Sequence, residues 1–286
     1  MKTGTGIFVF LVFGGIFFSA CGNSGGGQGE NDQLPTQAVE TAFFAKYPSA
    51  SDVNWEAKGV FQQSDFNIGQ MEYEAWFNRS GIWLQAEYST TYMNLPSKVK
   101  DLIANNINYP PTSWTPQEKV EVLDRKNYLL WYEIELKNGV QEVKIWSDAD
   151  GYASRIVIED LDGNDIPSTI SSFIAIKYRN GLITEVIKLV NNFYEANLLD
   201  GENVKIVHFN ASMNWLYTDW SVMLADLPQV VKAALDAPAY QDFTVKSASY
   251  QQYPDGDHYH FVLSQRDMAG PDISVNVDLN GNVIPD

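Results

Sequence analysis

Cysteine is nearly absent from this chain, and its absence removes several kinds of chemistry at once. The 286 residues include one cysteine, Cys21, and three histidines, none of which precedes His208. A single cysteine leaves no internal disulfide and no cysteine-based metal site. There is also no Gly-x-Ser-x-Gly motif, and the only glycine cluster stands at residues 22–29. These absences argue against nucleophilic catalysis and against a phosphate-binding loop, so we expect no enzyme, no cofactor and no bound metal.

Positive charge is scarce as well. The chain has 19 Lys and Arg residues against 36 Asp and Glu residues, a formal net charge of −17. Such a chain repels phosphate backbones and anionic lipid surfaces, so we expect no nucleic-acid partner. The acidity favours solubility over an acidic binding function.

The apolar run at the N-terminus is too short to be a membrane anchor. It extends from Ile7 to Phe18, and small residues follow it up to Cys21. This pattern predicts a signal peptide over residues 1–20 and lipidation of Cys21. Residues 21–33 are predicted to form a flexible tether. The pattern resembles that of bacterial lipoproteins, which implies an exported protein anchored in the cell envelope by its N-terminal lipid only, at the outer membrane on the periplasmic or surface side.

A pattern that occurs four times dominates the rest of the chain. An apolar residue followed by proline recurs at intervals of 61, 71 and 61 residues: Leu34-Pro35, Leu95-Pro96, Ile166-Pro167 and Leu227-Pro228. Each pair opens a stretch with helical apolar spacing, and apolar and polar residues then alternate between glycine-containing turns. We predict an α+β fold of four tandem repeats, each a helix followed by an antiparallel meander.

Pairs of repeats are the expected folding unit, because a unit of about 60 residues is marginal on its own. We therefore predict one domain over residues 34–160 and a second, more divergent domain over residues 166–286. The polar stretch 159–165 would join them.

Several motifs of the first half resemble the beta-lactamase-inhibitor-like, PepSY-like family. They are Lys46-Tyr47-Pro48, Tyr73-Glu74-Ala75, Tyr132-Glu133-Ile134-Glu135-Leu136 and the turn Asp148-Ala149-Asp150-Gly151. In the second half the third copy lacks the proline after Tyr178. The resemblance implies an exported protein whose helix-on-sheet repeats leave a sheet face available to a partner, as in a beta-lactamase inhibitor. It does not imply that a beta-lactamase is the partner.

Strand parity predicts which side chains form that face. If Met71, Tyr73, Ala75 and Phe77 cover the helix, the alternate positions point to the opposite side. The same parity assigns Leu84 inward and Trp83 outward. The predicted partner-binding residues are Trp76, Trp83, Trp131, Trp146, Glu72, Glu74, Glu133 and Glu135. The alternative is that a neighbouring repeat covers this face, which would make the tryptophans part of a second core.

Two further features need an interpretation. His258 and His260 share one face of a predicted strand, but no third metal ligand is visible nearby, so a solvated pair is favoured. The Asp148-Ala149-Asp150-Gly151 segment lacks the acidic residues that would complete a calcium loop, and a β-turn explains it. The leading hypothesis is a non-enzymatic, lipid-anchored envelope protein that binds an envelope protein or peptide, possibly as an inhibitor does. The second hypothesis is a small-ligand or cation sensor.

Overall fold

The structure is a computed structural model and describes residues 35–161, 163–266 and 272–285. The predicted signal peptide, the lipidation site Cys21 and the tether lie outside the described residues. Within the described residues, no helix has the length and apolar character needed to cross a membrane.

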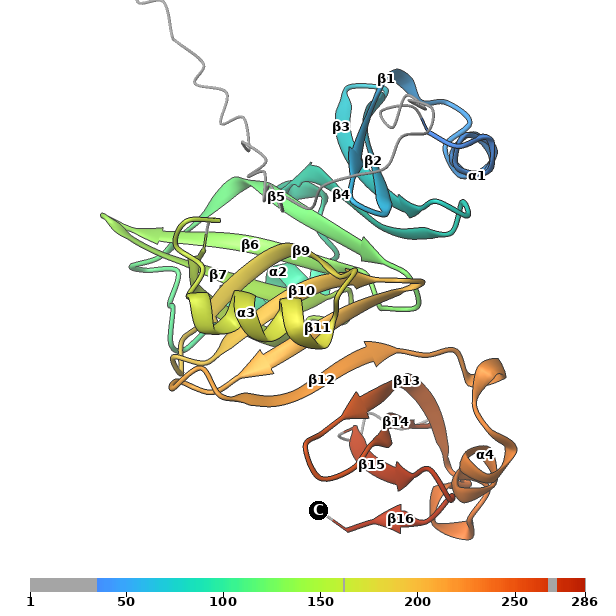
Figure 1. The fold of residues 1–286 in the computed structure, drawn as a ribbon. Coiled ribbons are helices and arrows are strands. Elements are labelled where there is room, and N and C mark those ends of the chain that lie inside the picture. Colours follow the sequence, from blue (N-terminus) through green and yellow to red (C-terminus); the bar gives the residue numbers. More distant parts are fainter. Residues whose placement is uncertain (1–34, 162, 267–271, 286) are drawn as a thin grey trace, which may run out of the picture. The chain divides into compact units, whose positions relative to one another are not determined.

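Each predicted repeat is present as one α-helix followed by four strands (Figure 1). The first repeat contains α1 (Gln37–Lys46), β1 (Ser51–Lys58), β2 (Phe61–Ile68), β3 (Met71–Asn78) and β4 (Trp83–Thr91). The second contains α2 (Ser97–Ala104), β5 (Thr115–Arg125), β6 (Trp131–Asn138), β7 (Gln141–Asp148) and β8 (Ala153–Asp160). The third contains α3 (Ser168–Lys177), β9 (Leu182–Leu189), β10 (Tyr194–Asp200), β11 (Asn203–Phe209) and β12 (Trp215–Ser221). The fourth contains α4 (Gln229–Leu235), β13 (Phe243–Gln252), β14 (His258–Gln265), β15 (Ile273–Asp278) and β16 (Val283–Ile284). Short 3₁₀ helices occur at η1 (Tyr92–Asn94), η2 (Leu224–Asp226) and η3 (Pro238–Tyr240).

In the described part of the chain, the strands form one antiparallel sheet in which each strand pairs with the next in sequence, from β1 to β16. The α+β class and the architecture of helix-plus-meander repeats are therefore confirmed. The two halves meet where β8 pairs with β9, and the predicted polar junction contributes Glu159 and Asp160 to that pairing. The division into domains at residues 34–160 and 166–286 remains a prediction.

Proline stands at the start of each helix, as the sequence predicts. Pro96, Pro167 and Pro228 are the N-cap residues of α2, α3 and α4. A proline costs little there because the first N–H groups of a helix have no partner within the helix. In α1 the N-cap is Thr36, whose side-chain oxygen accepts a hydrogen bond from the N–H of Val39.

The ends of α1 and α3 are alike although their sequences differ. Tyr47 and Tyr178 are the C-cap residues, and their N–H groups donate to the carbonyls of Phe43 and Ile174. The third repeat reaches this geometry without the proline that follows Tyr47. The tyrosine side chain itself is buried in both repeats, so its packing is sufficient to position the helix end.

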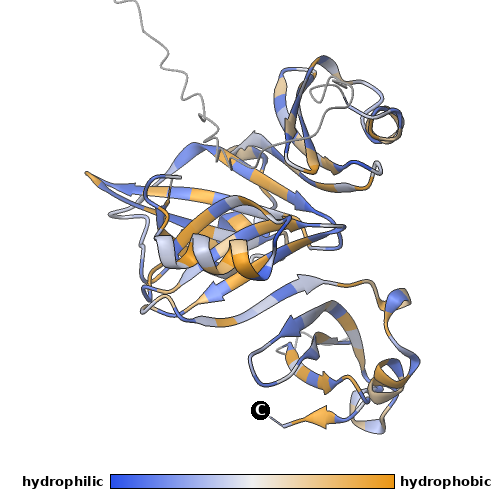
Figure 2. Ribbon diagram, in the orientation of Figure 1, coloured by the Kyte–Doolittle hydropathy of each residue, from blue (hydrophilic) through white to orange (hydrophobic). Residues whose placement is uncertain are grey.

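Each helix packs on one face of the strands of its own repeat. The first repeat buries Val39 and Phe43 of α1 against Phe66, Ala75 and Phe77. Equivalent clusters centre on Val99 and Ile103 in α2, on Ile170 and Ile174 in α3, and on Val231 in α4. Figure 2 shows the apolar and hydrophilic residues that alternate along the strands and supply these clusters.

The same turn joins the third and fourth strands of every repeat. Its first residue is Asn78, Asp148, Asn210 or Asp278, and in each case its side-chain oxygen accepts hydrogen bonds from two backbone N–H groups of the turn. Asp148 receives its bonds from the N–H groups of Asp150 and Tyr152. This geometry confirms a β-turn at residues 148–151, with its aspartate occupied by backbone donors.

Candidate functional site

The two faces predicted from strand parity are present in the first two repeats. Tyr73, Ala75 and Phe77 pack with α1, whereas Trp76 belongs to a separate apolar cluster. In the second repeat Ile134 and Leu136 pack with α2. We call the side of the sheet that is turned away from the helices the back face.

The back face of the first two repeats is covered by the third repeat. One apolar cluster joins the first repeat to the β10–β11 hairpin through Phe61, Trp76, Leu84, Leu199 and Val204. A second cluster joins the second repeat to β9 through Leu123, Trp146, Val157 and Ile187. Residues more than 100 positions apart in sequence therefore form a second core on this face.

The prediction of a solvent-open face is consequently wrong for three of the eight proposed partner-binding residues. Trp76 is 6% exposed, Trp146 is 0% exposed and Glu133 is 7% exposed. The Trp146 Nε1 group donates a 2.7 Å hydrogen bond to Glu133 Oε2. The alternative stated from the sequence, a face covered by a neighbouring repeat, holds for these residues, because burying large indole rings stabilises the contact between repeats.

Trp83 is on the side opposite to the one predicted. A β-bulge separates the pairs Trp76↔Gln85 and Phe77↔Trp83, and the extra residue is Leu84. A bulge reverses the parity of the residues beyond it, so Trp83 packs against the helix-side cluster and Leu84 against the third repeat. The Lys46 ammonium lies 3.6 Å from the centre of the Trp83 ring.

The other four proposed residues keep some exposure. Glu72 is exposed, and Glu74, Trp131 and Glu135 are partly exposed. Trp76 Nε1 donates to Glu74 Oε1 at 2.6 Å, which ties that carboxylate to the buried cluster. Glu72 and Glu74 belong to β3, and β4 and β5 separate that strand from β6, which carries Trp131 and Glu135. The structure places these residues in two patches rather than on one surface.

A buried arginine links the second and third repeats. Arg125 Nη1 donates to Asn197 Oδ1 at 3.2 Å, and its Nη2 lies 3.6 Å from Glu185 Oε2. Asn197 Nδ2 in turn donates to Glu185 Oε2 at 2.5 Å. Burial raises the pKa of Glu185 to about 8 even though the positive charge of Arg125 opposes the rise.

A second charged group surrounds His208, the first histidine of the chain. His208 Nε2 lies 2.5 Å from Asp219 Oδ1, and its Nδ1 lies 3.3 Å from Glu195 Oε1. Arg155 Nε also donates to Glu195. Burial by itself would lower the pKa of His208, but Glu195 and Asp219 outweigh it and raise the pKa to about 9. The imidazole is therefore a cation at neutral pH and holds the strands together electrostatically rather than acting as a general base.

The back face of the fourth repeat differs, because its residues keep contact with solvent. Gln251, Tyr253, His258, His260 and Asn276 are all partly exposed. Pairing of Gln251 with His258 and of His260 with Asn276 places them on one side of the sheet. That side is opposite to Phe261, Val275 and Val277, which pack with α4.

Aromatic rings stack along this exposed face and continue into the covered one. The ring of His208 is stacked on Tyr217 with centres 4.0 Å apart, and Tyr217 on Tyr253 at 5.0 Å. Tyr253 is stacked on His258 at 4.9 Å. The strand parity that singled out the tryptophans would also have found this row, but of its members the sequence analysis considered only His258, and only as a metal ligand.

The two histidines do not belong to a metal cluster. His260 Nδ1 lies 2.8 Å from Asn276 Oδ1, and His258 is stacked on Tyr253. Among the residues described, no group of three or more His, Cys, Asp or Glu side chains is arranged to hold a metal ion. Burial lowers the pKa of His258, and the neighbouring His260 lowers it further.

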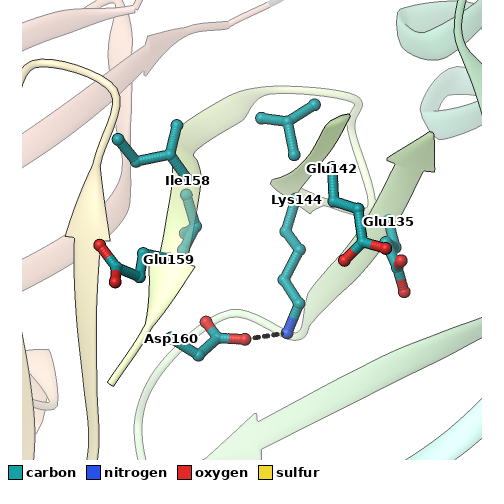
Figure 3. A pocket seen from close by; sticks show the side chains of 8 residues that line it. Glu135, Glu142, Lys144, Ile158, Glu159 and Asp160 are labelled. Carbon is teal, nitrogen blue, oxygen red and sulfur yellow. Dashed lines mark hydrogen bonds and ion pairs between the residues drawn. The ribbon is translucent and has the colours of Figure 1, made fainter. Parts of the chain in front are cut away.

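A small pocket of about 90 Å³ lies at the edge of the second repeat. Lys144 is the only basic residue that lines it, and acidic residues contributed by β6, β7 and β8 surround it (Figure 3): Glu135, Glu142, Glu159 and Asp160. The Lys144 ammonium bonds to Asp160 and lies 2.7 Å from Glu133 Oε1. Because its charge is satisfied from within the chain, the pocket is an internal ion-pair network.

Comparison with known proteins identifies relatives of both halves. The profile of the beta-lactamase-inhibitor-like, PepSY-like family matches residues 61–154 and 192–285. A BLIP-like protein from Bacteroides fragilis is 24% identical, with a TM-score of 0.40 over 47% of this chain and 92% of that one. A DUF2874 family protein from Bacteroides ovatus is 17% identical, with a TM-score of 0.38 over 43% of this chain and 86% of that one. No curated protein matches the chain.

Proposed function

Because this chain belongs to the beta-lactamase-inhibitor-like, PepSY-like family, we propose that it is a non-enzymatic envelope protein that binds a protein or peptide partner. The proposed binding surface is the back face of the fourth repeat, formed by Gln251, Tyr253, His258, His260 and Asn276. The first three repeats have no equivalent surface on offer at Trp76 and Trp146, because those rings are buried.

One observation carries the proposal. The same side of the same sheet is packed with apolar and ionic contacts in the second repeat and partly exposed in the fourth. The exposed residues are tyrosine, histidine, glutamine and asparagine, which combine aromatic contact area with hydrogen-bonding groups. That composition is typical of surfaces that recognise other proteins.

We also propose that the protein is exported and held in the envelope by lipid on Cys21. The support is the N-terminal pattern of an apolar run followed by small residues and cysteine. A Cys21→Ser variant is expected to leave the membrane fraction and to lose incorporation of labelled palmitate. Retention of the variant in the membrane would contradict the lipid anchor without affecting the proposed binding surface.

The binding surface can be tested by site-specific photocrosslinking in envelope extracts. A photoreactive residue placed at Gln251 or at the exposed Ser274 should form an adduct of one defined mass with a partner. The control position is Val140, which is 99% exposed in the turn between β6 and β7 and lies outside the proposed surface. Val140 should give no such adduct.

A substitution sharpens the same test. Tyr253→Ala should reduce the adduct formed from Gln251 about 10-fold, as expected when a central aromatic contact is lost. Glu118→Ala, on the exposed part of β5, is the matched control and should leave the adduct unchanged. Equal adducts from Val140 and Gln251, or no effect of Tyr253→Ala, would refute the proposed surface.

A further inference from the structure

The Arg125 cluster lies in the covered part of the back face and has an unusual balance of charge. We define it as Arg125 from β5, Asn197 from β10, Glu185 from β9 and Glu87 from β4. The Arg125 side chain is 2% exposed and reaches from the second repeat to two residues of the third. It is the one cation of this cluster, and the two glutamates supply two carboxyl groups.

Glu185 faces further charged groups on several strands. Arg125 approaches it from β5, while Glu87, Glu133 and Asp160 raise its pKa from β4, β6 and β8. Lys144 is bound between Glu133 and Asp160 and therefore compensates those two carboxylates rather than Glu185. Glu185 depends on Arg125 for compensation and on Asn197 for a hydrogen bond.

Glu87 has a similar environment with fewer partners. Arg125 lowers its pKa, while Glu74, Glu133 and Glu121 raise it from β3, β6 and β5. Its neighbour along β4 on the same face is Gln85, which is 1% exposed and pairs directly with Arg125. A neutral amide cannot compensate a carboxylate, so the two glutamates share the charge of one arginine.

Apolar contacts enclose the cluster. Trp146 lies beneath the guanidinium, whose central carbon is 5.4 Å from the ring centre. Leu123, Val157 and Ile187 pack with that ring between the repeats. Water is largely excluded by such packing, so an additional negative charge here is costly.

We propose that the Arg125 cluster is a proton-dependent clasp that holds the second and third repeats together while Glu87 and Glu185 share a proton, and that it loosens when both carboxyl groups are ionised. The clasp stands apart from the proposed binding surface, since it lies in the part of the back face that is already covered. It would make the tightness of the folded protein depend on the pH of its surroundings across the neutral range.

The direction of the pH effect follows from the two glutamates. Burial raises the pKa of Glu87 to about 7 and that of Glu185 to about 8. An unfolded chain releases these protons near the ordinary glutamate pKa, whereas the folded chain retains them into the neutral range. Their contribution to stability is thus complete below the unfolded pKa and is lost as the pH rises through 7 and 8.

Thermal unfolding of the wild type and of Glu185→Gln across pH 6 to 8.5 tests the clasp. Glutamine keeps the size and hydrogen-bonding capacity of the protonated acid but cannot ionise. The wild-type Tm should fall by about 5 °C over this range, and Glu185→Gln should remove about half of that fall. Glu118→Gln, a substitution on the exposed part of β5, should retain the full wild-type slope.

A local measurement separates the clasp from other titrating groups. His208 also loses stabilising charge as the pH rises through about 9, so part of the wild-type slope belongs to it. Hydrogen exchange, corrected for its intrinsic pH dependence, should show a several-fold faster opening of β5, β9 and β10 at pH 8.5 than at pH 6. Glu185→Gln should suppress that change. Equal slopes for the wild type and Glu185→Gln, or exchange in these strands that is independent of pH, would overturn the proposal.

Discussion

Trp146 in the second repeat is fully buried against the third repeat, whereas Asn276, at the same position of the fourth repeat, is partly exposed. Both residues bond to the partner directly across the neighbouring strand, Trp146 to Glu133 and Asn276 to His260. The backbone and the cross-strand pairing are the same, and the surroundings are opposite. The side chains of this face therefore reflect what covers the sheet, while the strand pattern alone does not.

Truncation of the tryptophan should give the largest contrast between these repeats. Trp146→Ala is expected to lower the free energy of unfolding by about 3–5 kcal/mol, because a large fully buried side chain leaves a cavity. Asn276→Ala should cost less than about 1 kcal/mol, because the residue is partly exposed. Chemical denaturation measures both values. Similar losses at the two positions would mean that the fourth repeat is covered as well.

A feature shared by both repeats should respond equally in each. A Cβ atom on Gly151 would lie 2.5 Å from the carbonyl oxygen of Lys98, and one on Gly281 would lie 2.5 Å from that of Val230. Both glycines also have positive φ angles. Gly151→Ala and Gly281→Ala should each cost about 2–3 kcal/mol.

The matched control for these turns is Gly139. It has a positive φ as well, but nothing lies within 4 Å of its Cβ position. Gly139→Ala should cost only about 1 kcal/mol, which is the backbone contribution alone. If all three variants lose the same amount, the contact between turn and helix contributes nothing, and the shared frame rests on backbone conformation.

The first and third repeats extend the comparison to the helix ends. Thr218 Oγ1 accepts hydrogen bonds from the Tyr178 hydroxyl at 2.8 Å and from Trp215 Nε1 at 3.0 Å. The same place in the first repeat holds Ala86, which has no hydroxyl to offer Tyr47 and Trp83. Thr218→Ala should therefore cost about 1–3 kcal/mol, because it leaves two buried polar groups without this acceptor.

The reverse substitution tests the same reasoning. Ala86→Ser places a hydroxyl near the helix end of the first repeat and should raise the free energy of unfolding by about 0.5–1 kcal/mol in urea titrations. A loss of stability in Ala86→Ser would show that the first repeat has no room for the hydroxyl and that the two helix ends differ in packing as well as in bonding.

Metal ions should have the smallest effect. Zinc or calcium in large excess is expected to change the Tm by less than about 1 °C, because a ligand that does not bind the folded state cannot stabilise it. His260 is engaged with Asn276, and His258 is stacked on Tyr253. A rise in Tm that is lost in His258→Ala would favour the cation-sensor hypothesis and would contradict the reading of the fourth repeat as a protein-binding surface.

Local patterns in the sequence were sufficient for much of the fold. Proline, helical spacing and a glycine turn recur in each repeat, and each of them acts within a few residues. The inward positions Tyr73, Ala75 and Phe77 followed from parity because β3 is regular. Trp83 was misplaced because a bulge depends on how two strands pair, and nothing in the local sequence marks it.

The repeat architecture, the helix boundaries and the alternation of faces were determined by the sequence alone, because they arise from interactions between near neighbours in the chain. Which part of the back face is buried was decided only by the tertiary structure. Trp76 and Trp146 lose their solvent contact to residues of the third repeat, while the row from Tyr253 to Asn276 keeps it. Contacts between distant segments depend on how the twisted sheet brings its repeats together, and no local periodicity encodes that arrangement.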